Sequence, residues 1–327
     1  MVSPSTVSSA PEHAELEAHR RELTSYCYRM LGSPFDAEDA VQETMVRAWR
    51  ARDRFEGRAA VRTWLHRIAT NVCLDVLKGK ERRVTPMDLG PAAEPLAENL
   101  HVPNDPRWIE PIPTAWVSPE ADPADVAVGR ESVRLALVAA LQELPARQRA
   151  ALLLREVLGW EAGDMAELLD TSVASVNSAL QRARATLASR NLSVNDPAPH
   201  LSDSDRQLLE RYMAAFEGYD FAGLAKLIRE DASQSMPPYD MWLQGRDDIF
   251  AWWVGPGIGC RGSRLLATAG ANGLPAFGQY KPSPAGGFEP WALQVVELDG
   301  DRIGELTFFL DTARLFPLFA LPPRLDA

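Results

Sequence analysis

The chain lacks several features that would place it at once in a particular class. Its three cysteines, Cys27, Cys73 and Cys260, lie far apart and form no Cys-x-x-Cys pair. A disulfide framework and a structural zinc site are therefore not expected. The five histidines are scattered along the chain. We expect no metal and no cofactor.

Long apolar runs are also missing. No stretch of about 18 apolar residues occurs, which argues against a membrane-spanning helix. The first twenty residues lack the basic and apolar blocks of a secretory signal. We expect a cytoplasmic protein in a reducing compartment, with no membrane partner and with a disordered N-terminus over residues 1–13.

Positive charge is scarce in the chain as a whole but concentrated locally. The 327 residues carry 34 Lys and Arg against 45 Asp and Glu, a net charge of −11. Residues 50–84 nevertheless hold 10 bases and 4 acids, whereas residues 85–129 hold 1 base and 8 acids. Because the local field decides whether a surface can meet phosphate, the first of these segments remains suited to nucleic acid.

Three stretches differ in their pattern. Apolar residues recur at helical spacing in residues 14–84 and again in residues 130–190, which predicts two all-α domains. Residues 85–129 contain nine prolines, which is typical of an extended acidic linker. Trp108, Ile109 and Trp116 are unusual in a solvated linker, since apolar residues of this kind usually dock on another surface.

The sequence ELLDTSVASVNSALQRAR, residues 167–184, predicts a helix, a tight turn and a second helix. Asp170 tolerates the left-handed geometry of such a turn, and Thr171 or Ser172 can cap the second helix. Val176, Leu180, Ala183 and Leu187 are expected to face inward. The outward face carries small polar and cationic side chains suited to a DNA groove: Ser172, Ala174, Ser175, Asn177, Ser178, Gln181, Arg182 and Arg184. An ordinary helical corner with a solvated basic end is the alternative.

Residues 203–320 show helices followed by strand patterns, with a hairpin turn at Asp299–Gly300, and predict an α+β domain. Six large side chains could line a ligand pocket or could simply form core: Met236, Tyr239, Trp242, Trp253, Tyr280 and Trp291. An enzyme would need a histidine or carboxylate as its acid or base. No histidine follows His200, and no motif marks a carboxylate.

Taken together, DAEDAVQETMVRAWR, RFEGRAAVRTWLHRIATNVCLD, LPARQRAALLLREVLGWEAGDMAELL and SVNSALQRAR resemble the extracytoplasmic-function sigma factors of bacterial RNA polymerase. The resemblance covers residues 14–84 (sigma2) and 130–190 (sigma4). Residues 203–320 resemble the SnoaL-like cone domains fused to some of these factors. The resemblance implies core RNA polymerase and promoter DNA as partners, and a small-molecule ligand of the cone domain stays open.

The resemblance also implies residue roles. A helix beginning at Asp36 would contact core polymerase through Asp36, Asp39, Gln42, Glu43 and Trp49. The −10 element would be read by Arg58, Arg62, Thr63, Trp64, Arg67 and Asn71, with core packing as the alternative for Trp64. The linker would thread through polymerase channels. Ala179 stands where many members have a basic residue, so fewer phosphate contacts are expected at the −35 element.

Two other functions stay open from the sequence. One is a DNA-binding regulator that does not recruit polymerase. The other is an isomerase or hydrolase of the SnoaL/NTF2-like class whose helical half is a scaffold or a DNA-binding part. We expect a transcription initiation factor that directs promoter-specific initiation and is not an enzyme, with a C-terminal domain that modulates its activity by sensing a ligand or by contacts alone.

Overall fold

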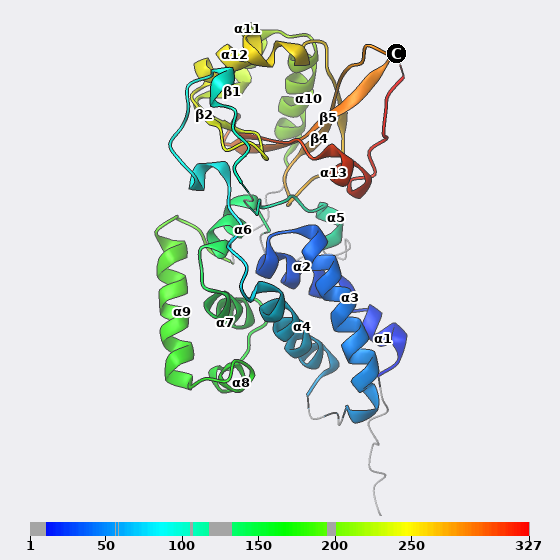
Figure 1. Cartoon of the computed structure of the whole chain (residues 1–327), viewed down its shortest axis with the longest axis vertical. Coiled ribbons are helices and arrows are strands. Elements are labelled where there is room, and N and C mark those ends of the chain that lie inside the picture. Colours follow the sequence, from blue (N-terminus) through cyan, green and yellow to red (C-terminus); the bar gives the residue numbers. More distant parts are fainter. Residues whose placement is uncertain are drawn as a thin grey trace, which may run out of the picture. The chain divides into compact units, whose positions relative to one another are not determined.

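The computed structural model describes residues 11–55, 57, 59–104, 107–117, 133–194 and 201–326. The chain divides into two compact units (Figure 1). The first comprises Met1–Arg83 and Trp116–Pro197, and the second comprises Val84–Ala115 and Ala198–Ala327. Arg58 and most of the predicted N-terminal tail lie outside the described residues.

The first half of unit one is helical, as the periodicity predicts. Ser33 caps α3 by accepting a hydrogen bond from the Asp36 backbone at 3.3 Å, and Pro34 opens the helix with a φ that suits it. Gly32 ends α2 with a φ of 69°, a left-handed conformation that favours glycine. The predicted stripe of Ala37, Val41, Met45 and Ala48 is buried. The elements are α1 (His13–Glu17), α2 (Arg20–Leu31), α3 (Pro34–Ala51), η1 (Arg52–Arg54) and α4 (Val61–Leu77).

The described residues 133–194, in the second half of unit one, form four more helices around a core of leucine and alanine. Within this unit α7 packs against both α2 and α4, so the two helical halves share an interface. The helices are α6 (Leu135–Gln142), α7 (Ala146–Glu156), α8 (Ala162–Leu168) and α9 (Val173–Ala188).

Unit two is built on a six-stranded sheet with strand order β2-β1-β6-β5-β4-β3. Neighbouring strands are antiparallel except β1 and β6, which run parallel. Gly300, with a φ of 63°, turns β5 into β6 where Asp299 pairs with Arg302, so the predicted hairpin is confirmed. The strands are β1 (Ile228–Ser235), β2 (Trp242–Gln244), β3 (Arg264–Ala267), β4 (Ala276–Pro282), β5 (Phe288–Asp299) and β6 (Arg302–Phe309).

Helices cover one face of this sheet and bury a large apolar core with it (Figure 1). The covering helices are α10 (Asp203–Glu217), α11 (Phe221–Leu227) and α12 (Arg246–Val254), the last followed by η5 (Pro256–Cys260). A C-terminal helix, α13 (Thr312–Leu318), brings Phe316 against the ring of Tyr280, with 5.1 Å between centroids. The α+β class predicted for this part of the chain is confirmed.

Residues Val84–Ala115, here called the strap, belong to unit two, although Trp116–Pro197 of unit one separates them in the sequence from the rest of that unit. Two hydrogen bonds join Asn272 of unit two to Ile112 of the strap. The Asn272 backbone N–H donates to the Ile112 carbonyl at 2.9 Å, and Asn272 Oδ1 accepts from the Ile112 N–H at 3.0 Å. Ile109 and Ile112 are buried, whereas Trp108 and Trp116 are only partly so. The strap contains η2 (Pro86–Asp88) and η3 (Ala97–Asn99) and leads into α5 (Thr114–Val117).

Candidate nucleic-acid interface

The turn between α8 and α9 has the geometry that the sequence predicts. Asp170 takes a φ of 49°, and the Thr171 N–H returns to the Ala166 carbonyl at 2.9 Å. Ser172 caps α9, since its Oγ accepts from the Ser175 N–H at 3.1 Å. Arg147 on α7 adds a contact that the sequence analysis missed, donating from Nη1 to the Leu169 carbonyl at 3.0 Å. These bonds fix the angle between the two helices.

Helix α9 has one buried face and one exposed face. Val176, Leu180, Ala183 and Leu187 are buried, as predicted. All eight residues proposed for the DNA side are exposed: Ser172, Ala174, Ser175, Asn177, Ser178, Gln181, Arg182 and Arg184. A helix that presents short polar side chains at its N-terminal end can approach base edges in a major groove.

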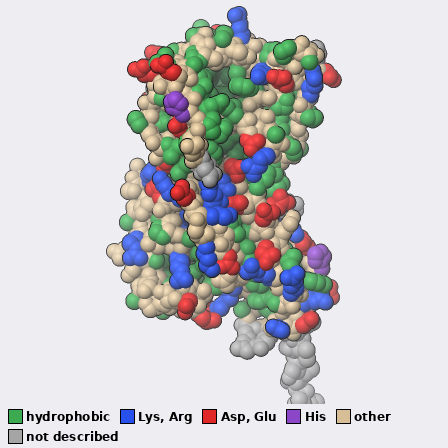
Figure 2. All heavy atoms as spheres, viewed as in Figure 1, with side chains coloured by type: hydrophobic (Ala, Val, Ile, Leu, Met, Phe, Trp, Pro, Cys, Tyr) green, Lys and Arg blue, Asp and Glu red, His purple; other side chains and the backbone are tan. Residues whose placement is uncertain are grey.

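The two cations of α9 differ in their surroundings. Arg184 donates from Nε to Glu156 Oε1 on α7 at 2.9 Å. Within the described part of the chain, no acidic side chain pairs with Arg182. Positive and negative side chains are interspersed over the face of unit one seen in Figure 2, so several of its cations have carboxylates close by.

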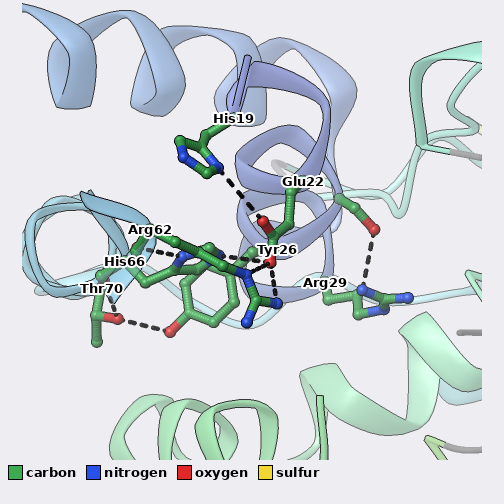
Figure 3. Close-up of polar contacts among 8 residues, drawn as sticks. His19, Glu22, Tyr26, Arg29, Arg62, His66 and Thr70 are labelled. Carbon is green, nitrogen blue, oxygen red and sulfur yellow. Dashed lines mark hydrogen bonds and ion pairs between the residues drawn. The ribbon is translucent and has the colours of Figure 1, made fainter. Parts of the chain in front are cut away.

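On α4, the side chain of Arg62 is bound within its own domain (Figure 3). Its Nε donates to Glu22 Oε1 on α2 at 2.7 Å. His66, one turn further along α4, donates from Nδ1 to the Arg62 carbonyl at 2.9 Å and brings its Nε2 to 3.7 Å from Glu22 Oε1. Below it, Tyr26 and Thr70 join their hydroxyl groups at 2.8 Å.

Burial and charge act in opposite directions on this network. Burial alone would raise the pKa of Glu22, but the hydrogen bond from Arg62, with His66 and His19 close by, lowers that pKa overall. The pKa of His66 is lowered because the imidazole is buried, although the Glu22 carboxylate partly opposes the shift. His66 is therefore neutral and Glu22 ionised near neutral pH, and the Glu22 carboxylate holds the Arg62 guanidinium.

The remaining −10 candidates are not all in one environment. Thr63 and Arg67 are half-buried, and Asn71 is exposed. Trp64 packs against Phe55, with 5.1 Å between ring centroids. Arg67 contacts the α8 region of the second helical half, where its Nη1 lies 3.0 Å from Glu167 Oε1. Arg58 lies outside the described residues.

The polymerase candidates on α3 form an exposed face, with one exception. Asp39, Gln42, Glu43 and Trp49 are exposed. Val46, which the sequence analysis did not select, lies at the helical spacing between them and is 41% exposed. Asp36 differs because it forms an ion pair with the largely buried Arg83 at 2.7 Å. Its local role is to hold the chain after α4 against the start of α3.

The six large side chains proposed as a ligand pocket differ in their surroundings. Met236 and Trp253 are members of the apolar core, and Tyr239 and Trp291 pack against it. Tyr280 instead donates its hydroxyl hydrogen to the Pro322 carbonyl and packs against α13. Trp242 donates from Nε1 to the Gly90 carbonyl of the strap at 2.9 Å.

A chain of buried amides crosses the core of unit two. The Tyr212 hydroxyl donates to Gln294 Oε1 at 2.9 Å, Gln294 Nε2 donates to Gln279 Oε1 at 3.0 Å, and Gln279 Nε2 donates to Ser263 Oγ at 3.1 Å. Burial raises the pKa of Tyr212 far above its ordinary value, so the phenol stays protonated. Each amide in this chain both donates and accepts, which satisfies the buried polar atoms.

The residues that the structure describes hold neither a metal-binding cluster nor a membrane-spanning helix. Among them, no cluster of three or more histidine, cysteine, aspartate or glutamate side chains is arranged to hold a metal ion. Their helices include none with the length and apolar character needed to cross a bilayer.

Two helical halves, one of which displays a capped recognition helix, joined to an α+β domain define a multidomain protein of the helix-turn-helix class. Residues 16–83 match the family Sigma-70 region 2, and residues 134–187 match Sigma-70, region 4. The ECF RNA polymerase sigma factor SigG of Mycobacterium tuberculosis is 46% identical over 318 residues, covering 95% of this chain and 84% of that protein. The chain belongs to the extracytoplasmic-function family of RNA polymerase sigma factors.

Other relatives support the same assignment and the fold. SigJ of Mycobacterium tuberculosis, also an ECF RNA polymerase sigma factor, is 29% identical over 289 residues, covering 83% of this chain and 84% of that protein. The crystal structure of SigJ superposes with a TM-score of 0.62 at 22% identity, covering 95% of this chain and all of that one. The whole architecture, including the C-terminal domain, is thus a fold found in another sigma factor.

Proposed function

We propose that the chain binds core RNA polymerase through the exposed face of α3 and reads promoter DNA with α4 and α9. The observation that carries this proposal is the geometry of α9. Its inner face is buried, its N-terminus is capped by Ser172, and its outer face presents the eight polar, small and cationic side chains. That arrangement suits insertion into the major groove at the −35 element.

For the −10 element, the support is electrostatic and local. Residues 50–84 carry the excess of bases, and Arg62, Thr63, Arg67 and Asn71 all stand on α4. A base turned out of a duplex needs a pocket and a cationic surround for its backbone. Trp64 takes a different role in this proposal: its contact with Phe55 shapes the start of α4.

For the polymerase contact, the support is the mixed character of the α3 face. Asp39 and Glu43 are acidic, while Val46 and Trp49 are large apolar side chains exposed to solvent. An apolar centre bordered by charge is typical of a protein interface. Asp36 is left out of this contact because Arg83 already pairs with it.

Transcription in vitro with purified core polymerase and a library of genomic promoters tests the proposal. The intact chain should select a set of promoters sharing two elements. Substitution of Ser175 or Gln181 should change the preferred upstream element, and substitution of Arg67 or Asn71 should reduce opening at the downstream one. If every variant selects the same promoters with the same strength, the assigned reading faces are wrong.

For the C-terminal domain, we propose a regulatory and non-catalytic role exerted through the strap. Asn272, Trp242 and Gly270 bind the strap's backbone. In the described part of unit two, the buried polar side chains are amides and hydroxyls, and none is the histidine or carboxylate that acid–base catalysis requires. In the sequence the strap lies between the two helical halves. Binding or release of the strap by unit two therefore changes how many residues are free to span the distance between those halves.

A further inference from the structure

One large apolar side chain of α9 is exposed to solvent. Val173 is the first residue of the helix, and it is 46% exposed. The other large apolar side chains of α9, those of Val176, Leu180 and Leu187, are all buried. Val173 belongs neither to the predicted inner face nor to the eight residues proposed for the DNA side, so its place on α9 is a finding of the structure.

The helix itself does not favour valine at this position. A β-branched side chain loses rotamer freedom in a helix, and valine has a lower helix propensity than alanine. The cap is provided by the preceding residue, since Ser172 Oγ accepts from the Ser175 N–H at 3.1 Å. Single exposed apolar residues are common on protein surfaces, so the argument for a role depends on where Val173 stands.

Val173 stands at the end of α9 that would enter a DNA groove. The Cα–Cβ bonds of an α-helix tilt toward its N-terminus, so the isopropyl group of the first residue projects at that end. The residues around it in the sequence, Ser172, Ala174 and Ser175, are exposed and short. Because short neighbours let the helix end approach the bases closely, the methyl groups of Val173 can reach the base edges.

The chemistry of the major groove defines what an isopropyl group can recognise there. The C5 methyl of thymine is the apolar group that the base pairs present in this groove, and the remaining groups are hydrogen-bond donors and acceptors. A donor or acceptor covered by Val173 would lose its water without gaining a partner, which is unfavourable. Val173 therefore favours thymine over the other three bases.

A neighbouring side chain fits the same kind of base pair. Asn177 stands four residues after Val173 and is exposed, so the two side chains lie on successive turns along one side of α9. A carboxamide can bond to both N6 and N7 of adenine in the major groove. Together the two side chains suit one A·T pair or two adjacent ones.

We propose that Val173 is a specificity-determining residue of α9, and that it contacts the C5 methyl group of one thymine in the −35 element. This inference rests on the proposed role of α9 in reading that element. Burying one methyl group in such a contact should change the affinity for DNA by about three- to fivefold.

The test uses the full chain bound to core polymerase and a labelled duplex carrying a promoter selected in the transcription experiment. Each thymine of its −35 element is replaced in turn by deoxyuridine, which removes the methyl group and keeps the base pairing. One replacement should weaken binding by about three- to fivefold. Val173→Ala should bind the unmodified duplex more weakly by a similar factor and should no longer respond to that replacement.

Val254→Ala is the matched control, because it makes the same change at a 52% exposed position at the end of α12. It should bind every duplex as the unaltered chain does. If the unaltered chain and Val173→Ala respond equally to each deoxyuridine, or if the selected −35 element contains no thymine, the inference is overturned. If scrambling the whole upstream element leaves binding unchanged, the proposed function of α9 fails, and the assignment of Val173 fails with it.

Discussion

Arg184 on α9 and Glu156 on α7 are joined by a hydrogen bond of 2.9 Å from Nε to Oε1. The carboxylate is the more sheltered partner, with its side chain 20% exposed against 55% for the arginine. The pair connects the C-terminal half of the recognition helix to the helix that supports it. Arg184 is consequently a positioning residue as well as a candidate phosphate contact, whereas no carboxylate among the described residues pairs with Arg182, the second candidate.

This difference predicts distinct salt responses for the two arginines. Arg182→Ala should weaken binding to all promoter sequences alike and lower the slope of log K against log salt by about 0.9 for each phosphate that the variant no longer neutralises. Arg184→Ala should change the slope less, because its charge is already compensated by Glu156. Measuring affinity across a salt series checks this, with Glu156→Gln as the variant that frees Arg184. A slope unchanged in Arg182→Ala would exclude the phosphate contact.

Ser172 provides a test of local stability. Ser172→Ala removes the acceptor for the Ser175 N–H and should lower the free energy of unfolding by about 0.5–2 kcal/mol. Ser178→Ala, on the exposed face of the same helix, should be nearly neutral or slightly stabilising, since alanine favours helix. Urea denaturation followed by circular dichroism measures both. Similar losses in the two variants would mean that the cap contributes nothing particular.

The buried imidazole of His66 predicts a loss of stability on mild acidification. Its pKa in the folded chain lies below the ordinary value of 6.5 because burial disfavours the charged form. Above pH 6.5 neither state takes the proton. As the pH falls below 6.5 the unfolded chain binds a proton that the folded chain resists, so stability falls, by at most about 1.4 kcal/mol per pH unit. The Glu22 carboxylate and the hydrogen bond to the Arg62 carbonyl oppose this shift in the His66 pKa, whereas the positive charges of Arg62 and His19 reinforce it.

Thermal unfolding between pH 7.5 and 5.0 measures this effect. His66→Gln should lose less stability over the range than the unaltered chain, and His101→Gln, at an exposed position of the strap, should lose as much as the unaltered chain. Glu22 acts in a lower window. Its lowered pKa means that its contribution is present above the ordinary glutamate value of 4.5 and disappears as the pH falls through the folded value. If the stability of the unaltered chain, of His66→Gln and of His101→Gln falls equally with pH, the loss is not due to His66.

The α3 face yields a prediction for polymerase binding. Asp39→Arg combined with Glu43→Arg should abolish co-purification with core polymerase while the circular dichroism spectrum stays the same, because both side chains are exposed. Glu15→Arg combined with Asp53→Arg changes the net charge equally at exposed positions on α1 and η1 and should retain binding. Retention by the α3 variant would rule out this face as the contact.

Asn272 offers a selective way to loosen the strap. Its φ of 55° is left-handed, so Asn272→Gly allows the same backbone conformation and removes the carboxamide side chain whose Oδ1 accepts from the Ile112 N–H. Leaving that buried N–H without its acceptor should cost about 1–3 kcal/mol. Hydrogen exchange of the full chain should then accelerate at Ile112 and Thr114, while the amides of β5 stay protected. Unchanged exchange at Ile112 would mean that Asn272 does not hold the strap.

Much of the local structure could be predicted from the sequence because it depends on neighbours along the chain. Helical periodicity placed the buried stripe of α3 and the inner face of α9. Asp170 predicted the left-handed turn, Thr171 or Ser172 was the predicted cap, which Ser172 provides, and Asp299–Gly300 predicted the hairpin. The motifs also carried the family resemblance. Each of these features involves interactions within a few residues, so residue type and spacing are sufficient.

The polar contacts between residues far apart in the sequence were decided by tertiary structure alone. Arg62 meets Glu22 across 40 residues, Arg67 meets Glu167 across 100, and Ile112 meets Asn272 across 160. An arginine in a basic stretch has the same sequence signature whether its guanidinium faces solvent, DNA or a carboxylate of another helix. Only packing, which sets the distance and burial of the two groups, determines which of these cations are paired and which segment the C-terminal domain holds.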